Sequence, residues 1–162
     1  MTYLEFCLER LAPDNELFHI VHGIIGEVLE VAELEGNNFD PEREEYLKEF
    51  GDILFYLTLF KHFVGYHSAT PKPCTIEQFS NHTKRVLYYQ SDDWDFDLLQ
   101  GFETIILTSM MEKGFTIQEI KEANREKLSK RYAKNFTTKE AIERKDTRDS
   151  YIQTRLFKDK SY

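Results

Sequence analysis

Two pairs of carboxylates carry the chemistry that this sequence can offer. Glu27 and Glu30 lie in the segment GEVLE, and Glu49 and Asp52 lie in EFGD. The members of each pair are three positions apart, so both carboxylates project from one face of a helix. Each pair borders an apolar face that must pack inward, where like charges repel unless a proton or a cation offsets them. Four hard oxygen ligands on two facing helices therefore indicate a Mg²⁺ site, with Mn²⁺ as the alternative ion.

Acidic helices also have an ordinary explanation. A single ExxE pattern is common on a solvated helix face, and such a face needs no metal. The interleaving of acids with apolar residues favours a metal site, but spacing alone leaves both interpretations open.

The elements that must position these acids are helices. Helical periodicity runs through nearly the whole chain, and no segment alternates as a strand would. Capping residues and glycines mark the helix boundaries. They predict helices at about 3–12, 15–35, 40–64, 75–90, 91–113 and 116–134, with a last short helix capped at residue 137. The fold class is therefore all-α, a bundle of about five to six helices, in which the second and third are antiparallel neighbours that turn both acid pairs toward one cavity.

Composition excludes several classes of protein. The 162 residues, 41% of them hydrophobic, predict one folded domain at 1–146 rather than a disordered chain. The longest apolar stretch, at 53–60, is too short to span a membrane. The first residues lack the basic region of a signal peptide, and two cysteines make no disulfide framework, so we expect a cytoplasmic protein.

The charge is unevenly distributed. The net charge of −8 combines −14 over residues 1–120 with +6 over residues 121–162, and residues 147–162 form a charged C-terminal tail. An acidic body argues against binding to a nucleic-acid polymer, because that affinity depends on neutralising phosphates. The basic end could meet phosphate locally, or it could be a solvated amphipathic helix and tail.

Together these motifs resemble a known family. The segment GEVLE at 26–30, followed after 18 residues by EFGD at 49–52 and the apolar run ILFYL, resembles the MazG-type all-α nucleoside triphosphate pyrophosphohydrolases. That family carries ExxE, a spacer and then ExxD. The later segment ANREKLSKRY resembles its third region, which implies phosphate or sugar contacts by Asn124, Lys127 and Arg131. The resemblance covers about 15–64 and 114–136, and it leaves about 66–113 as an inserted helical segment in a MazG-like core.

The resemblance implies a reaction. The family cleaves a nucleoside triphosphate between the α- and β-phosphates, using Mg²⁺, to give the monophosphate and pyrophosphate. The implied metal ligands and catalytic residues are Glu27, Glu30, Glu49 and Asp52, without an assignment of the one that orients the water. A homodimer or homotetramer is also implied. Two other hypotheses stay open: the same chemistry on a phosphoribosyl or alarmone-like nucleotide, and a non-catalytic helical interaction or regulatory protein.

Overall fold

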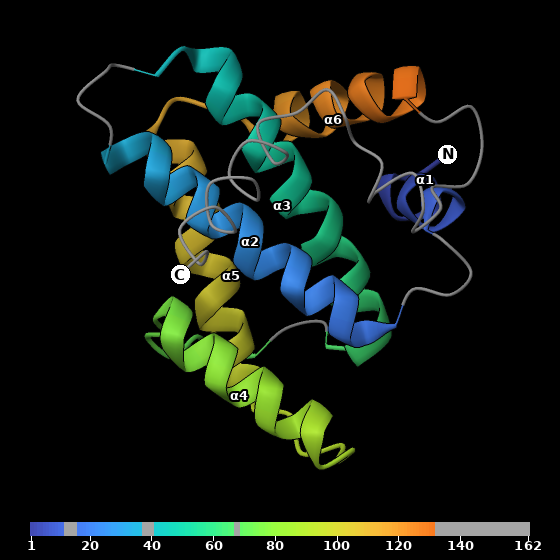
Figure 1. Cartoon of the computed structure of the whole chain (residues 1–162), viewed down its shortest axis with the longest axis vertical. Helices are drawn as coiled ribbons and strands as arrows, with labels where there is room; N and C mark the ends of the chain where they lie inside the picture. The colour runs from blue at the N-terminus through green and yellow to red at the C-terminus, as the bar shows by residue number, and fades with distance from the viewer. Residues whose placement is uncertain (12–15, 37–40, 67–68, 132–162) are drawn as a thin grey trace, which may run out of the picture.

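The described part of the chain is entirely helical. The computed structural model describes residues 1–11, 16–36, 41–66 and 69–131, and its only regular elements there are helices (Figure 1). The predicted all-α class is therefore confirmed. The predicted helix at 137 and the tail at 147–162 lie outside the described residues. In order, the helices are α1 (Tyr3–Arg10), α2 (Leu17–Gly36), α3 (Arg43–Val64), α4 (Ile76–Tyr88), α5 (Phe96–Glu112) and α6 (Ile117–Arg131).

The predicted capping boxes of the fourth and sixth helices are present. Thr75 Oγ1 accepts a hydrogen bond from the Gln78 N–H at 3.1 Å, and Gln78 Oε1 accepts one from the Thr75 N–H at 2.8 Å. Thr116 Oγ1 accepts from the Glu119 N–H at 3.1 Å. These bonds satisfy N–H groups that have no partner within the first helical turn, which is why α4 and α6 begin where the sequence predicts.

The third helix begins later than predicted. It starts at Arg43, after Pro41, and the N-cap is Glu42, whose N–H donates to Glu45 Oε2 at 3.2 Å. The predicted start at about 40 lies outside the described residues.

The fifth helix also begins later than predicted, at Phe96 rather than at 91. Its N-cap is Asp95, whose Oδ1 accepts from the Leu98 N–H at 3.1 Å. The Asp95 N–H donates to His82 Nε2 at 3.0 Å, and its carboxylate pairs with Lys72 at 2.9 Å. These contacts from α4 and the preceding loop select Asp95 among the aspartates of the segment SDDWDFD.

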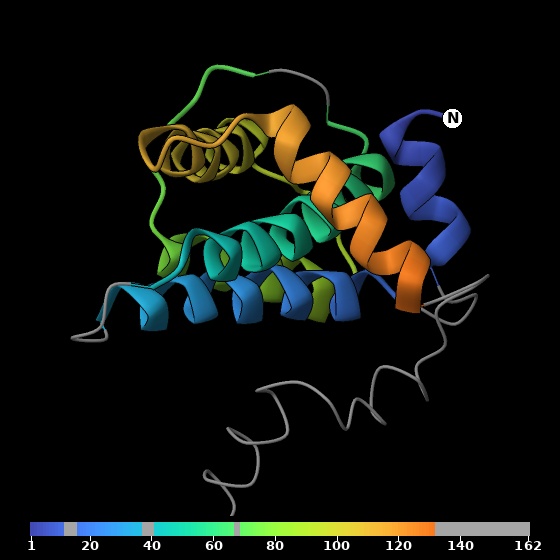
Figure 2. The same ribbon diagram turned by 90° about the horizontal axis from the view of Figure 1, so that it is seen from above.

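Helix α3 is the central element of the bundle. Helix α2 lies antiparallel beside it, as predicted, and α6 crosses it on the side where α1 also lies (Figure 2). One cluster of buried apolar residues contains side chains from each of the six described helices, so they share a single core. None of these helices is long and apolar enough to cross a membrane.

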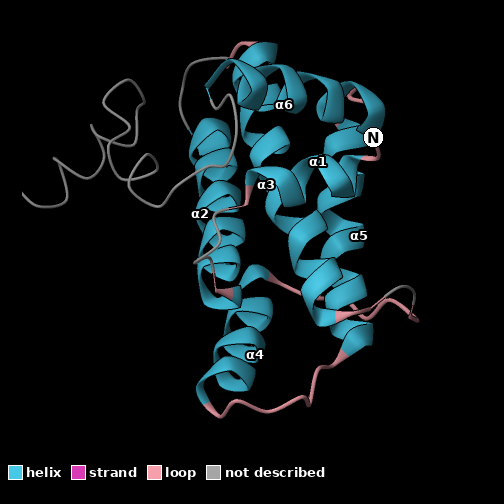
Figure 3. Ribbon diagram, turned by 90° about the vertical axis from the view of Figure 1, so that its right-hand side faces the viewer, coloured by secondary structure: helices cyan, strands magenta, loops and turns pink. Residues whose placement is uncertain are grey.

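The segment predicted as an insertion packs through aromatic side chains. Helix α4 lies at the end of the bundle away from α6, and α5 runs back from that end toward α6 (Figure 3). The rings of Phe79 and Phe102 stack with their centroids 3.9 Å apart, and Trp94 packs edge-on against Phe60 at 5.6 Å. Trp94 is therefore a partly buried residue that packs against the core.

Candidate metal centre

Two glycines allow the helices that carry the site to approach one another closely. A Cβ atom on Gly23 of α2 would lie 2.7 Å from the ring of Tyr56 on α3. A Cβ atom on Gly51 of α3 would lie 3.1 Å from Cβ of Asn124 on α6. Both separations are shorter than ordinary van der Waals contact, so a larger residue at either position would force the Tyr56 ring or the Asn124 side chain to shift. Gly26 has nothing within 4 Å of its Cβ position, so close packing does not explain it.

Three of the four predicted acids come together. Glu27 and Glu30 on α2 and Glu49 on α3 each offer a carboxylate oxygen, and these oxygens lie within 4.8 Å of one another. Glu49 is buried, while the two α2 residues keep part of their surface exposed. We call these three residues the acidic triad. Its oxygens are hard donors gathered closely enough to hold a divalent cation, so the donor set fits Mg²⁺ or Mn²⁺.

The acidic triad is electrostatically strained. Two unit charges 4.8 Å apart repel by about 3.5 kcal/mol at an effective dielectric constant near 20. Burial raises the pKa of Glu27 well above its ordinary value, and the charges of Asp52, Glu30 and Glu49 raise it further, while Lys127 opposes them. A cation bound here would relieve the repulsion that otherwise favours protonation of Glu27.

The fourth acid is held by partners of its own. Asp52 is buried, and it lies outside the acidic triad among the described residues. Its Oδ1 accepts a hydrogen bond from Asn124 Nδ2 at 3.2 Å, and its Oδ2 forms an ion pair with Lys127 Nζ. Two residues of α6 that were predicted to contact phosphate therefore contact a carboxylate of α3 in this structure.

A tyrosine near the start of the chain hydrogen-bonds to the asparagine that holds Asp52. The Tyr3 hydroxyl donates to Asn124 Oδ1 at 2.8 Å, and both side chains are buried. Because Oδ1 accepts from Tyr3, Nδ2 of the same amide turns toward Asp52. Burial is also the main reason that the pKa of Tyr3 lies above its ordinary value. Sequence reasoning missed Tyr3, and no local pattern could have identified it, since it lies 121 positions from Asn124.

Two further basic residues, Lys48 and Arg131, differ in whether they have a partner in the described part of the chain. Lys48, which the sequence analysis did not single out, pairs with Glu49 at 3.1 Å. Arg131 is partly buried, and its Nη1 has no hydrogen-bond partner among the described residues. Arg131 follows Lys127 by four residues in α6, so both side chains project from one face of that helix.

Lys127 does not pair with a carboxylate on the surface of its own helix. A lysine at this position could pair instead with the acids of its own helix, Glu122 and Glu126. Glu126 instead pairs with Lys130 at 2.6 Å, and Glu122 accepts a hydrogen bond from Gln118 at 2.7 Å. Lys127 reaches across to α3, so this lysine contributes its positive charge to the acidic site rather than to the surface of α6.

Comparison of the chain with known proteins finds no match: no family model, no curated protein and no solved structure corresponds to it. The residues and their geometry are therefore the basis of the proposed function.

Proposed function

We propose that this chain is a divalent-metal-dependent nucleotide pyrophosphohydrolase, of the MazG-type class that its motifs resemble. The observation that carries the proposal is the acidic triad, formed by two adjacent helices, with Lys127 of a third helix paired to Asp52 beside it and acting on Glu27. An enzyme that cleaves a triphosphate needs both parts, since a bare acidic cluster would repel the substrate.

Different residues of the chain would bind the metal, bind the phosphates and hold Asp52 in place. Glu27, Glu30 and Glu49 would hold Mg²⁺, which when bound supplies positive charge to phosphate oxygens and acidity to water. Lys127 and Arg131 would hold phosphate oxygens from the opposite side, Arg131 through its fork of N–H donors and Lys127 as a point charge. Asn124 is buried and bonded at both ends of its amide, which favours a role in holding Asp52 rather than in contacting the sugar.

The proposed reaction is hydrolysis of the bond that joins the α- and β-phosphates of a nucleoside triphosphate. One water molecule is consumed, the bridging P–O bond breaks, and the products are a nucleoside monophosphate and pyrophosphate. A carboxylate of the site would accept the proton of the attacking water, and the bridging oxygen would leave with one product. Nucleoside diphosphate is not an intermediate.

One observation favours the competing hypothesis of a non-catalytic helical protein. Asp52 and Glu49 each have a lysine partner, as structural ion pairs do, and a buried pair can be retained for specificity of folding alone. The two hypotheses differ in what the acidic triad does when metal and nucleotide are added.

The deciding experiment is product analysis with a panel of ribo- and deoxynucleoside triphosphates. Purified protein with Mg²⁺ should release pyrophosphate and monophosphate in equal amounts, and EDTA should abolish the reaction. Stoichiometric release of diphosphate and orthophosphate would contradict the proposed bond cleavage, and the absence of turnover on the whole panel would favour the non-catalytic hypothesis.

A matched pair of variants connects activity with the acidic triad. Glu49→Gln removes one proposed ligand and should lower kcat at least about 10²-fold while helicity is unchanged. Glu33→Gln removes the same charge from an exposed position on α2 and should leave kcat unchanged. Equal activity of the two variants would remove Glu49 from the site.

A further inference from the structure

A cavity lies on the other side of α3 from the acidic triad. Its volume is about 410 Å³, which is within the range of small-molecule sites, roughly 300–1,000 Å³. Leu54, which lines it, is about 160° round the helix from Asp52, so the cavity and the acidic site occupy opposite faces of α3. An occupant of this cavity would not touch the acids of the proposed enzyme site.

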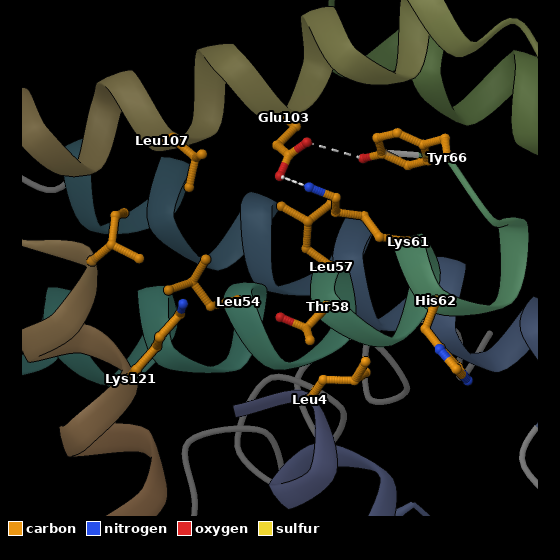
Figure 4. A pocket seen from close by; sticks show the side chains of 11 residues that line it. Leu4, Leu54, Leu57, Thr58, Lys61, His62, Tyr66, Glu103, Leu107 and Lys121 are labelled. Carbon is orange, nitrogen blue, oxygen red and sulfur yellow. Dashed lines mark hydrogen bonds and ion pairs between the residues drawn. The ribbon is translucent and has the colours of Figure 1, made fainter. Parts of the chain in front are cut away.

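The cavity has a predominantly apolar lining contributed by four helices. Helices α1, α3, α5 and α6 converge there (Figure 4). Contact with such a lining is favourable for an apolar or aromatic body and unfavourable for a fully polar molecule. The apolar side chains are Leu4, Leu54, Leu57, Leu107 and Ile117.

One end of the cavity is a satisfied polar network. Glu103 is buried and accepts hydrogen bonds from Lys61 Nζ at 2.6 Å and from the Tyr66 hydroxyl at 3.3 Å. Gln100 Nε2 donates to the same carboxylate at 3.2 Å. Lys61 and Glu103 cancel each other's charge, so this network fixes the shape of the cavity without adding a net charge.

The remaining charge in the lining is Lys121 of α6. Its ammonium group lies 5.4 Å from the centre of the Tyr3 ring, and among the described residues it forms no ion pair with a carboxylate. The side chain is half-buried and turns its amine toward the apolar residues of the cavity (Figure 4). With neutral histidine, the lining carries one net positive charge.

From this geometry we infer that the cavity is a second binding site, for a small amphipathic anion with one acidic group and a compact apolar body. The acidic group pairs with Lys121, and the body lies against the leucines of α3 and α5. This site is independent of the proposed hydrolysis, because it lies on the opposite face of α3.

The test uses two probes that differ only in charge. 1-Anilinonaphthalene-8-sulfonate is an amphipathic anion, and N-phenyl-1-naphthylamine is the same ring system without the sulfonate. The full chain should bind one sulfonate probe per molecule in a saturable titration followed by fluorescence, and at least about tenfold more tightly than the neutral probe. Equal affinities, or no saturable binding, would overturn the proposed anion site.

Substitutions in and outside the cavity test where the probe binds. Lys121→Gln should weaken binding of the sulfonate about tenfold and change binding of the neutral probe less than about twofold. Lys84→Gln, on the exposed face of α4, is the matched control and should change neither. Leu107→Trp fills the cavity and should reduce binding of both probes, while Glu49→Gln should bind them as wild type does.

Unchanged sulfonate affinity in Lys121→Gln would overturn the assignment of the charge partner. That variant is decisive even if Leu107→Trp does not fold, because Lys121 is only partly buried and glutamine removes little more than the contact of its ammonium group with the Tyr3 ring. Equal losses in Lys121→Gln and in Lys84→Gln would show that the probe responds to overall charge and would also overturn the site.

Discussion

Removing one charge from the acidic triad should stabilise the metal-free protein. In Glu27→Gln the side chain keeps its shape, but it no longer repels Glu30 and Glu49, whose oxygens lie within 4.8 Å. Each such repulsion is about 3.5 kcal/mol at an effective dielectric constant near 20. The attraction of Lys127 and the raised pKa of Glu27 offset much of this. We therefore expect a gain of about 1–3 kcal/mol in the free energy of unfolding at pH 8, or about 2–4 °C in Tm for each kcal/mol.

The gain should depend on pH in a defined direction. Burial and the neighbouring acids raise the pKa of Glu27 above its ordinary value of 4.5. The stability that protonated Glu27 provides is fully present below that ordinary value, and it is lost as the pH rises through the raised folded-state pKa. The difference between Glu27→Gln and wild type should therefore be small near pH 4.5 and should increase toward pH 8.

The assay is urea unfolding followed by circular dichroism, in EDTA, at several pH values from 5 to 8. Glu33→Gln, exposed on the same helix, is the control and should unfold as wild type does. Addition of Mg²⁺ at about 100 times its dissociation constant should stabilise wild type by about 2.7 kcal/mol and should stabilise Glu27→Gln much less. A pH-independent difference, or equal stabilisation of both proteins by Mg²⁺, would refute the electrostatic account of the acidic triad.

Other predictions concern the contacts around the triad and the assembly. Tyr3→Phe leaves Asn124 Oδ1 buried without its donor and should cost about 1–3 kcal/mol in urea unfolding, whereas a loss below about 0.5 kcal/mol would contradict the hydrogen bond. Gly26→Ala should stabilise α2 by up to about 1 kcal/mol, since its Cβ position is open, while Gly51→Ala should destabilise the fold because its Cβ would press on Asn124. The opposite order in thermal melts would refute this packing. If the proposed hydrolysis holds, Lys127→Ala should raise KM or lower kcat at saturating Mg²⁺, and unchanged values of both would exclude a phosphate contact. Sedimentation of the active protein should show a homodimer or homotetramer, and an active monomer at assay concentrations would contradict that expectation.

The helices, and the pairing of acids within each helix, were predictable from the sequence. A capping box such as that of Thr75 depends on residues three positions apart, so the local sequence determines it. In the same way, the spacing of Glu27 and Glu30 puts both on one face wherever their helix packs. The short connection between the second and third helices then favours an antiparallel arrangement, which brings Glu49 to the same site.

The tertiary structure decided which residue each carboxylate pairs with. Asp95 rather than Asp92 caps α5 because Lys72 and His82, from other segments, contact it. Such selection depends on where distant segments pack, and local propensity carries no information about that.

The position of Asp52 shows the same limit within the site. Its spacing from Glu49 predicted a common metal ligand, whereas its oxygens are taken up by Asn124 and Lys127 of α6. Tyr3 donates a hydrogen bond to Asn124, which lies 121 positions away in the sequence. This bond exists only because α1 packs beside α6 and because Gly51 lets α6 approach α3. The sequence alone determined which acids lie on which helix. Only packing between helices could decide which carboxylates face one another and which face a lysine, because that depends on contacts between distant segments.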